Sequence, residues 1–281
     1  MDTVKSEPTL HISKRNSFLP KVKYYYRSTC SIILLGTCAF YGIFASIYYN
    51  IKGTRQLGQY ATAKAYALVM KKFLGIEVKV EGRKYLETSS PCIFIANHQS
   101  ALDILVLGET WPKKCVVTAK KALKYVPFLG WFMSLSGALF LDRSNRSKSL
   151  GTLNNGIKEI IDIKGSIWMF VEGTRSHTTK LEMLPFKKGA FWLAKDSNLP
   201  IVPVIISNTS TINNNKLKIF NQGTIHVKVL EPISLKDVQS KEDMNAFVDK
   251  VETLMVNELK DNVGYATPTS FETGLPKEYA S

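Results

Sequence analysis

The sequence contains few of the residues that build disulfide frameworks or metal sites. Its four cysteines are Cys30, Cys38, Cys92 and Cys115; none forms a C-x-x-C pair, and all lie in apolar segments. They are typical of small hydrophobic residues in a reducing compartment, which argues against a disulfide-stapled secreted protein. The four histidines show no metal-ligand spacing, so we expect no metal site.

Several functional signatures are also missing. The chain has no P-loop, no G-x-S-x-G elbow, and no zinc-finger, RNP or concentrated basic recognition motif. Nevertheless, 37 Lys and Arg residues against 23 Asp and Glu residues give a formal net charge of +14. Such a surplus implies an anionic partner. Because nucleic acid is disfavoured, we expect that partner to be an anionic membrane or a phosphorylated substrate.

One long segment has no charge at all. Residues 28–51 contain no Asp, Glu, Lys or Arg. As a helix they would extend about 36 Å, which exceeds a bilayer hydrocarbon core of about 30 Å. Tyrosines cluster at both ends, as in an aromatic belt. The run is too long and starts too late for a cleaved signal peptide, so a membrane helix is expected, with a buried soluble helix as the alternative.

The regions around this segment define the expected domain organisation. Residues 1–27 are polar and basic and are predicted to be a disordered tail. Residues 57–74 resemble a second helix with apolar and cationic faces, so 28–74 is expected to be a membrane anchor. The first helix either spans the bilayer or forms a hairpin with the second that dips into one leaflet. The flanking charges are too evenly distributed to set an orientation.

Beyond the anchor, we expect a catalytic domain at 75–262 and a C-terminal tail at 263–281. Short β-rich runs alternate with helical stretches, which predicts an α/β fold with a mixed, largely parallel sheet flanked by helices. The expected strands are 77–80, 92–96, 116–119, 138–142, 167–171, 201–206 and 224–230. The expected helices are 101–110, 121–135, 148–164, 187–197 and 241–260.

Residues 97–103, with the sequence NHQSALD, follow the second of these strands directly. His98 and Asp103 would point about 140° apart on a continuous helix. They can meet only if His98 lies in the strand-to-helix loop and Asp103 in the first turn of the next helix. The carboxylate could then hold one ring nitrogen and leave the other free as a base. Without further evidence, a histidine that follows a strand is more often an ordinary polar loop residue than a catalytic base.

Basic turns at two further strand ends strengthen the catalytic interpretation. Arg143 ends one strand, and the turn Glu172-Gly173-Thr174-Arg175 ends another. Guanidinium groups beside a glycine turn suit a phosphate, because they offer forked, charge-assisted hydrogen bonds. Sites in such sheets gather beyond the carboxyl ends of strands, so one cleft could hold these groups with His98. Lys120 and Lys187 are candidate additional anion-binding residues, with a solvated surface as the alternative.

A second uncharged run covers residues 125–141 and is broken by Pro127 and Gly130. It is too short and irregular for a confident membrane span. It could line an acyl pocket, touch the membrane, or be a core helix running into a strand. His177 is read as a solvated loop residue and His226 as an exposed strand position.

Four ordered segments resemble the motifs of the glycerolipid acyltransferases that carry a His-x4-Asp signature. They are NHQSALD (97–103), GALFLDR (137–143), FVEGTRS (170–176) and LPIVPV (199–204), within about residues 75–235. The runs TAKK (118–121) and KYVPFLGW (124–131) resemble the 1-acyl-glycerol-3-phosphate acyltransferases of fungi, as does the N-terminal apolar segment. The family usually has proline where this chain has Val171, a difference expected to affect loop shape and acceptor preference rather than the catalytic groups.

The resemblance implies transfer of a fatty acyl group from the co-substrate acyl-CoA to the sn-2 hydroxyl of lysophosphatidic acid, giving phosphatidic acid. His98 would be the general base and Asp103 its orienting partner, with Arg143, Glu172, Gly173, Thr174 and Arg175 at the substrate phosphate. Glu172 would orient the phosphate donors or the acceptor. No bound cofactor is expected. The implied partners are lysophosphatidic acid, acyl-CoA and membrane phospholipids, and the implied location is the endoplasmic reticulum membrane or lipid droplets.

Other functions stay open at this stage. The same motifs serve acyltransferases that use glycerol 3-phosphate or another lysophospholipid as acceptor. A membrane hydrolase would release free fatty acid without an acceptor. A non-catalytic lipid-binding protein would need the membrane segment and the positive surface but not the His98–Asp103 pair.

Overall fold

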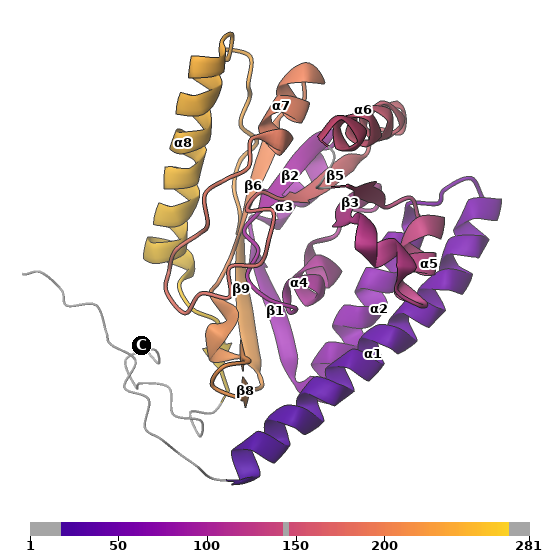
Figure 1. The fold of residues 1–281 in the computed structure, drawn as a ribbon, viewed down its shortest axis with the longest axis vertical. Helices are drawn as coiled ribbons and strands as arrows, with labels where there is room; N and C mark the ends of the chain where they lie inside the picture. Colours follow the sequence, from indigo (N-terminus) through magenta and orange to yellow (C-terminus); the bar gives the residue numbers. More distant parts are fainter. Residues whose placement is uncertain (1–17, 143–145, 270–281) are drawn as a thin grey trace, which may run out of the picture.

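The computed structural model describes residues 18–142 and 146–269. Its central sheet has the strand order β1-β9-β6-β2-β5-β3-β4, with β10 beside β9 (Figure 1). The strands are Ile76–Glu81 (β1), Cys92–Ala96 (β2), Cys115–Lys120 (β3), Leu139–Leu141 (β4), Ser166–Phe170 (β5), Ile201–Ile206 (β6), Gly223–Val229 (β9) and Thr267–Pro268 (β10). Two further strands, Asn213–Asn214 (β7) and Ile219–Phe220 (β8), form a small separate pair.

Helices connect these strands. The longer helices are Phe18–Ile51 (α1), Leu57–Leu74 (α2), Arg146–Asp162 (α6) and Lys241–Glu258 (α8). The shorter ones are Arg83–Thr88 (α3), Asp103–Thr110 (α4), Lys121–Tyr125 (η1), Leu129–Leu135 (α5), Gly189–Asp196 (α7), Thr209–Thr211 (η2) and Leu259–Val263 (η3).

The prediction of a mixed, largely parallel sheet is confirmed. Strand β2 pairs in parallel with β5 and β6, and β3 pairs in parallel with β4 and β5. Strand β9 is parallel to β1 but antiparallel to β6 and β10. Strands β2 to β6 therefore direct their carboxyl ends toward one edge, where parallel sheets place their sites.

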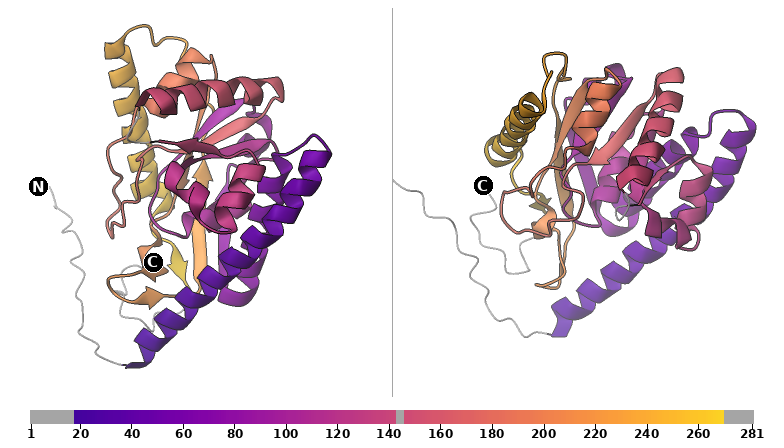
Figure 2. Two further views of the ribbon diagram at one scale, coloured as in Figure 1. Left: turned by 45° about the vertical axis from the view of Figure 1, so that its right-hand side comes forward. Right: turned by 45° about the horizontal axis from the view of Figure 1, so that its top comes forward.

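Helices cover both faces of the sheet. The side chains of β2 alternate, so that Phe94 joins one core cluster and Ile93 and Ile95 join the other. The first cluster packs under α2 and α4, and the second packs under α6, α7 and α8. All five β2 residues are buried, as expected for a strand covered on both sides. Figures 1 and 2 show α1 outside α2, on the side of the molecule away from α8.

Helix α1 differs from the sequence prediction at its beginning. The helix starts at Phe18, so the predicted disordered tail is wrong for residues 18–27, while residues 1–17 lie outside the described part. The Arg27 guanidinium donates to the backbone carbonyls of Leu74 and Asn221 and lies over the Phe220 ring. Charge in this stretch therefore anchors a packed helix rather than solvating a tail.

Two other boundaries were also wrong. The helix expected at 121–135 is divided into η1 and α5, because Pro127 breaks the pattern and Phe128 adopts a positive φ of 60°. The tail expected from residue 263 still contributes to the fold, since β10 pairs with β9. Residues 270–281 lie outside the described part.

Candidate active site

The site lies beyond the carboxyl ends of β2 and β5, which are neighbours in the sheet. His98 follows β2 by two residues, and Glu172 follows β5 by two residues. The backbone N–H of Val171 donates to the carbonyl of Ala96, at 3.1 Å, and joins the two strand ends. A proline at position 171 would lack this donor.

His98 and Asp103 form a hydrogen-bonded pair. Nδ1 of His98 lies 2.6 Å from Oδ2 of Asp103, the first residue of α4. The same oxygen accepts the backbone N–H groups of Gln99 and Ser100 at 2.7 and 3.1 Å. Asp103 is fully buried, whereas His98 is partly exposed at the site. The carboxylate therefore fixes the loop and leaves Nε2 of His98 directed away from Asp103.

Amide side chains pin the loop that carries His98. The Asn97 amide pairs with both backbone groups of Ile206 in β6, at 2.8 and 2.9 Å. The Gln99 side chain accepts from the Thr209 backbone at 2.9 Å. The ring of His98 also stacks on Phe170, with centroids 4.2 Å apart. Contacts to its backbone loop, to one ring nitrogen and to one face of the ring therefore fix the position of His98.

Glu172 acts on the backbone of the same loop. Its two oxygens accept the N–H groups of His98, at 2.6 Å, and Leu184, at 2.8 Å. The side chain is almost fully buried, and this burial raises the pKa of Glu172 to about 7, against the lowering effect of the two backbone hydrogen bonds. Both carboxylate oxygens are occupied by backbone, so Glu172 is placed to position His98 rather than to contact a phosphate.

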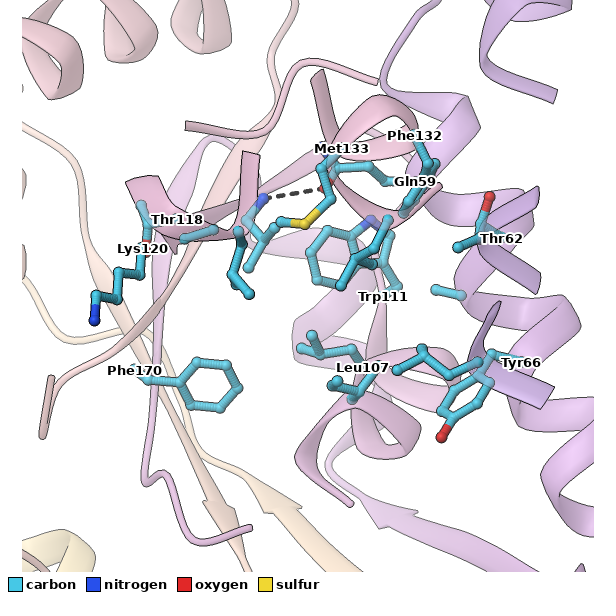
Figure 3. A pocket seen from close by; sticks show the side chains of 18 of the residues that line it. Gln59, Thr62, Tyr66, Leu107, Trp111, Thr118, Lys120, Phe132, Met133 and Phe170 are labelled. Atoms are coloured by element: carbon cyan, nitrogen blue, oxygen red, sulfur yellow. Dashed lines mark hydrogen bonds between the residues drawn. The ribbon is translucent and has the colours of Figure 1, made fainter. Parts of the chain in front are cut away.

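A cavity of about 450 Å³ opens beside His98. Figure 3 shows it extending from Lys120 and Phe170 toward Thr62 and Tyr66, with Leu107 and Trp111 between them. Its inner walls are mostly apolar and come from α1, α2, α4 and α5. The volume and composition are typical of a site for an apolar ligand with a few polar anchors.

Cationic and hydroxyl groups gather at the His98 end of the cavity. Lys120, Thr174, Arg175 and His177 line it there. His177 was predicted to be a solvated loop residue, and the structure confirms that it is exposed in a loop, where it also contributes to the cavity lining. It has a positive φ of 51°, a strained conformation for a histidine, and its N–H donates to the carbonyl of Gln99.

The other predicted anion-binding residues lie differently. Lys187 is exposed and is not part of the cavity wall; its aliphatic stem passes beside Gly173. Gly173 adopts a positive φ of 71°, and its N–H donates to the carbonyl of Phe170 within the turn. Arg143 lies outside the described residues, so its placement at the phosphate stays a prediction.

Sequence reasoning missed Gln59, a polar cavity residue on α2. Its amide accepts from the Val117 backbone at 3.1 Å and donates to the carbonyl of Ser136 at 3.0 Å. The side chain thereby joins α2 to β3 and to the turn after α5. The sequence signal that could have identified this role is a single glutamine on the face of α2 that packs against the domain.

Three comparisons with known proteins agree with this geometry. The sequence profile of the Acyltransferase family matches residues 77–207. The chain is 48% identical over 268 residues to a 1-acyl-sn-glycerol-3-phosphate acyltransferase of Saccharomyces cerevisiae, covering 94% of this chain and 87% of that protein. It is 36% identical over 185 residues to the human 1-acyl-sn-glycerol-3-phosphate acyltransferase beta, covering 66% of each.

The fold has a solved counterpart. The crystal structure of the 1-acyl-sn-glycerophosphate acyltransferase PlsC from Thermotoga maritima superposes with a TM-score of 0.65 at 25% identity, covering 87% of this chain and 96% of that chain. The shared sequence therefore extends beyond the motifs to α1 and α2. On this evidence the chain belongs to the 1-acyl-sn-glycerol-3-phosphate acyltransferases of the His-x4-Asp glycerolipid acyltransferase family and is similar to its fungal members.

Proposed function

We propose that the protein transfers a fatty acyl group from acyl-CoA to the sn-2 hydroxyl of 1-acyl-sn-glycerol 3-phosphate, giving phosphatidic acid and CoA. One observation carries the proposal: His98, hydrogen-bonded to Asp103, lies where the apolar part of the cavity meets its cationic end. A lysophosphatidic acid has the matching shape, with a fatty chain, a free hydroxyl and a phosphate. The yeast and human relatives are both named for the same acceptor, which supports this proposal.

In this mechanism His98 acts as the general base. Nε2 removes the proton of the acceptor hydroxyl while its oxygen attacks the thioester carbonyl. Asp103 keeps the proton on Nδ1 and stabilises the imidazolium that forms. The tetrahedral oxyanion collapses, the C–S bond breaks, and the departing CoA thiolate takes the proton from Nε2. Ser100 is bonded to Thr209 and to the Leu102 backbone, which disfavours an acyl-serine route.

The turn after β5 supplies the donors for negative charge. The Thr174 and Arg175 side chains at the cavity would hold the acceptor phosphate, with Lys120, which lines the same cavity, as a third group and the predicted Arg143 as a fourth. The backbone N–H groups of Thr174 and Arg175 have no hydrogen-bond partner among the described residues. We assign the oxyanion to these two amides, because the Gly173 amide is used within the turn.

We also propose that α1 docks into one membrane leaflet instead of crossing the bilayer. Among the described residues it is the only helix long and apolar enough to cross a membrane. Yet Arg27 donates to the carbonyl of Asn221 in the catalytic domain near one end of α1, and Asn50 donates to the carbonyl of Leu135 at the other. These residues are about 35 Å apart along the helix, so a spanning α1 would draw the domain into the bilayer. The endoplasmic reticulum or a lipid droplet is the proposed location.

The test is product analysis of the detergent-solubilised full chain, supplied with acyl-CoA and one acceptor at a time. We expect phosphatidic acid from lysophosphatidic acid and no lysophosphatidic acid from glycerol 3-phosphate. The opposite acceptor preference would assign the protein to the preceding acylation. Release of free fatty acid without an acceptor would indicate a hydrolase, and folded protein with no turnover would favour a lipid-binding role.

A methyl group at Gly42 is expected to change the chain length that the enzyme accepts. A Cβ there would lie 2.6 Å from both the Phe132 ring and the Thr62 hydroxyl, and both side chains line the cavity. In Gly42→Ala the flexible Phe132 side chain moves into the apolar end, so use of the longest acyl chains falls by about three- to tenfold relative to short ones. Product analysis across donor and acceptor chain lengths measures this.

The matched control for this change lies on the same helix. Gly36 has nothing within 4 Å of an added Cβ, so Gly36→Ala gains the same helix propensity without filling space. Identical chain-length profiles for the two variants would contradict the proposal that the cavity holds a fatty chain.

A further inference from the structure

The segment formed by η1 and the start of α5 leaves large apolar side chains in solvent. Residues 121–128 are all exposed, although five of them are apolar. Tyr125 is 73% exposed and Trp131 is 55% exposed. Monomeric proteins rarely leave contiguous apolar patches of this kind without a binding role. Neither the proposed reaction nor the docking of α1 accounts for this exposure.

The backbone holds this segment in a defined shape. Phe128 has a positive φ of 60°, and Leu129 and Gly130 donate to the carbonyls of Pro127 and Val126 at 2.6 and 2.7 Å. A Cβ on Gly130 would clash with the carbonyl of Lys124. The turn is therefore tight, and it presents Tyr125, Val126 and Phe128 outward because of its geometry.

The segment combines aromatic and cationic groups. Lys120, Lys121 and Lys124 are exposed beside Tyr125, and the Lys121 ammonium lies 3.0 Å from Asp142. Tyrosine and tryptophan favour the headgroup level of a bilayer, and lysines near the surface add attraction to anionic lipids. This chemistry matches an anionic phospholipid surface better than a protein groove, which would leave the ammonium groups desolvated.

The same segment connects the apolar face of α1 with the cavity. The Phe128 ring packs edge-on against Phe40 of α1, with centroids 5.7 Å apart, and Phe40 and Phe44 are themselves exposed. On the inner side, Leu123 and Leu129 line the cavity. One continuous apolar surface therefore leads from the exposed face of α1, across η1 and α5, to the cavity wall.

We infer that residues 120–131 dock into an anionic phospholipid bilayer as a second membrane contact and form the rim over which a fatty chain enters the cavity. The use of this rim by the substrate rests on the proposed function. The docking itself does not, because it follows from exposure, charge and continuity with α1.

The test places an environment-sensitive fluorophore at Tyr125→Cys in the full chain, reconstituted into vesicles of phosphatidylcholine and phosphatidylserine. We expect efficient quenching by doxyl-labelled lipid and protection from aqueous iodide, with weaker shielding in phosphatidylcholine alone. The matched control is Leu254→Cys, a 37% exposed apolar position on α8, on the side of the molecule away from α1 (Figure 1). Unaltered protein carried through the same labelling measures the background from the native cysteines.

Three outcomes would overturn the inference. Iodide access at Tyr125→Cys equal to that at Leu254→Cys would leave the segment in water. Protection from both quenchers would indicate a protein partner, such as a second copy of this chain. Equal protection of the Tyr125→Cys fluorophore from iodide in neutral and anionic vesicles would show that the lysines of the segment do not select an anionic surface.

An activity measurement then tests the rim. The double variant Tyr125→Asp and Trp131→Asp changes two exposed side chains that do not line the cavity. Its turnover of vesicle-embedded lysophosphatidic acid should fall at least about tenfold, since charged groups enter the interface poorly, while a water-soluble short-chain acceptor is used normally. Equal loss on both acceptors would contradict the rim. If the unaltered protein used neither acceptor, the proposed function would fail while the fluorophore result still decided the docking.

Discussion

Replacement of His98 by alanine is expected to lower kcat/KM for acyl transfer by about a thousandfold, the scale of a lost general base. The acceptor hydroxyl is a weak nucleophile until its proton is removed, and His98 is the group at the cavity whose orientation is fixed for this task. The fold should survive, because Oδ2 of Asp103 keeps its two backbone donors from Gln99 and Ser100. Steady-state kinetics in detergent, together with lysolipid binding, separate lost chemistry from lost binding.

Asp103→Asn tests the other half of the pair. Oδ1 of Asp103 has no hydrogen-bond partner among the described residues, so an asparagine can keep its oxygen on the three groups that Oδ2 now contacts and place its amide nitrogen at the Oδ1 position. The change therefore removes the negative charge that fixes the His98 tautomer and stabilises the imidazolium. We expect a fall in kcat of about a hundredfold or more with a small change in KM. His226→Ala provides the matched histidine control, since His226 lies on β9, outside the cavity wall, and bonds to Thr267. Near-normal turnover in His98→Ala would remove the general-base mechanism.

The second large effect is expected from Glu172→Gln. A glutamine can accept only one of the two backbone N–H groups that Glu172 now holds, so either His98 or Leu184 would face an amide donor. A buried unsatisfied donor costs about 1–3 kcal/mol, and the displaced His98 backbone should lower kcat by about a hundredfold. Because Glu172 acts through His98, most of the loss should appear in kcat rather than in KM.

Glu172 also predicts how stability depends on pH. Burial raises the pKa of Glu172 from 4.5 to about 7 in the folded protein. The folded state therefore binds this proton more tightly than the unfolded state, so the stability contribution is complete below pH 4.5 and is lost as pH rises through 7. The loss amounts to about 3 kcal/mol. The unfolding free energy of the wild type should accordingly fall by this amount relative to that of Glu172→Gln between about pH 4 and pH 8.

Activity should follow the ionised form of Glu172. Only the carboxylate accepts both backbone donors, so wild-type turnover should rise with pH through about 7. Asp243→Asn is the matched control: Asp243, in the first turn of α8, accepts the backbone N–H groups of Gln239 and Ser240, which precede the helix, and these bonds lower its pKa. Asp243→Asn should be less stable than the wild type at neutral pH, and this difference should shrink as pH falls because the wild-type carboxylate becomes protonated, while turnover stays unaltered. An unchanged pH profile in Glu172→Gln would show that Glu172 does not position His98.

The sequence predicted β2 and β6 at their observed boundaries because both strands are buried on each face and read as uninterrupted apolar runs. It predicted less well where packing overrides local pattern. Residues 18–27 were predicted to be a solvated tail. The carbonyls that Arg27 contacts belong to Leu74 and Asn221, which are far away in the sequence, so no local pattern indicated that this stretch packs against the domain. The division of the 121–135 helix depended on a positive φ at Phe128, a residue that rarely adopts one.

The candidate site shows the same division. The spacing of His98 and Asp103 was enough to state where each must lie if they are to meet, because a strand end and a helix start have local geometry. The orientation of Glu172 was not predictable, since carboxylates bind cations, phosphate donors and backbone amides equally well in principle. Only the pairing of β2 with β5 decided that it holds the His98 backbone.

By itself, therefore, the sequence determined the sheet, the position of the histidine–carboxylate pair and the family, because these are encoded in short segments with their own periodicity and spacing. The tertiary structure alone decided that α1 lies along the domain, that His177 faces the cavity, and that η1 is exposed beside it. The cavity walls come from α1, α2, α4 and α5 together. Its shape depends on contacts between residues distant in the chain, which no local pattern specifies.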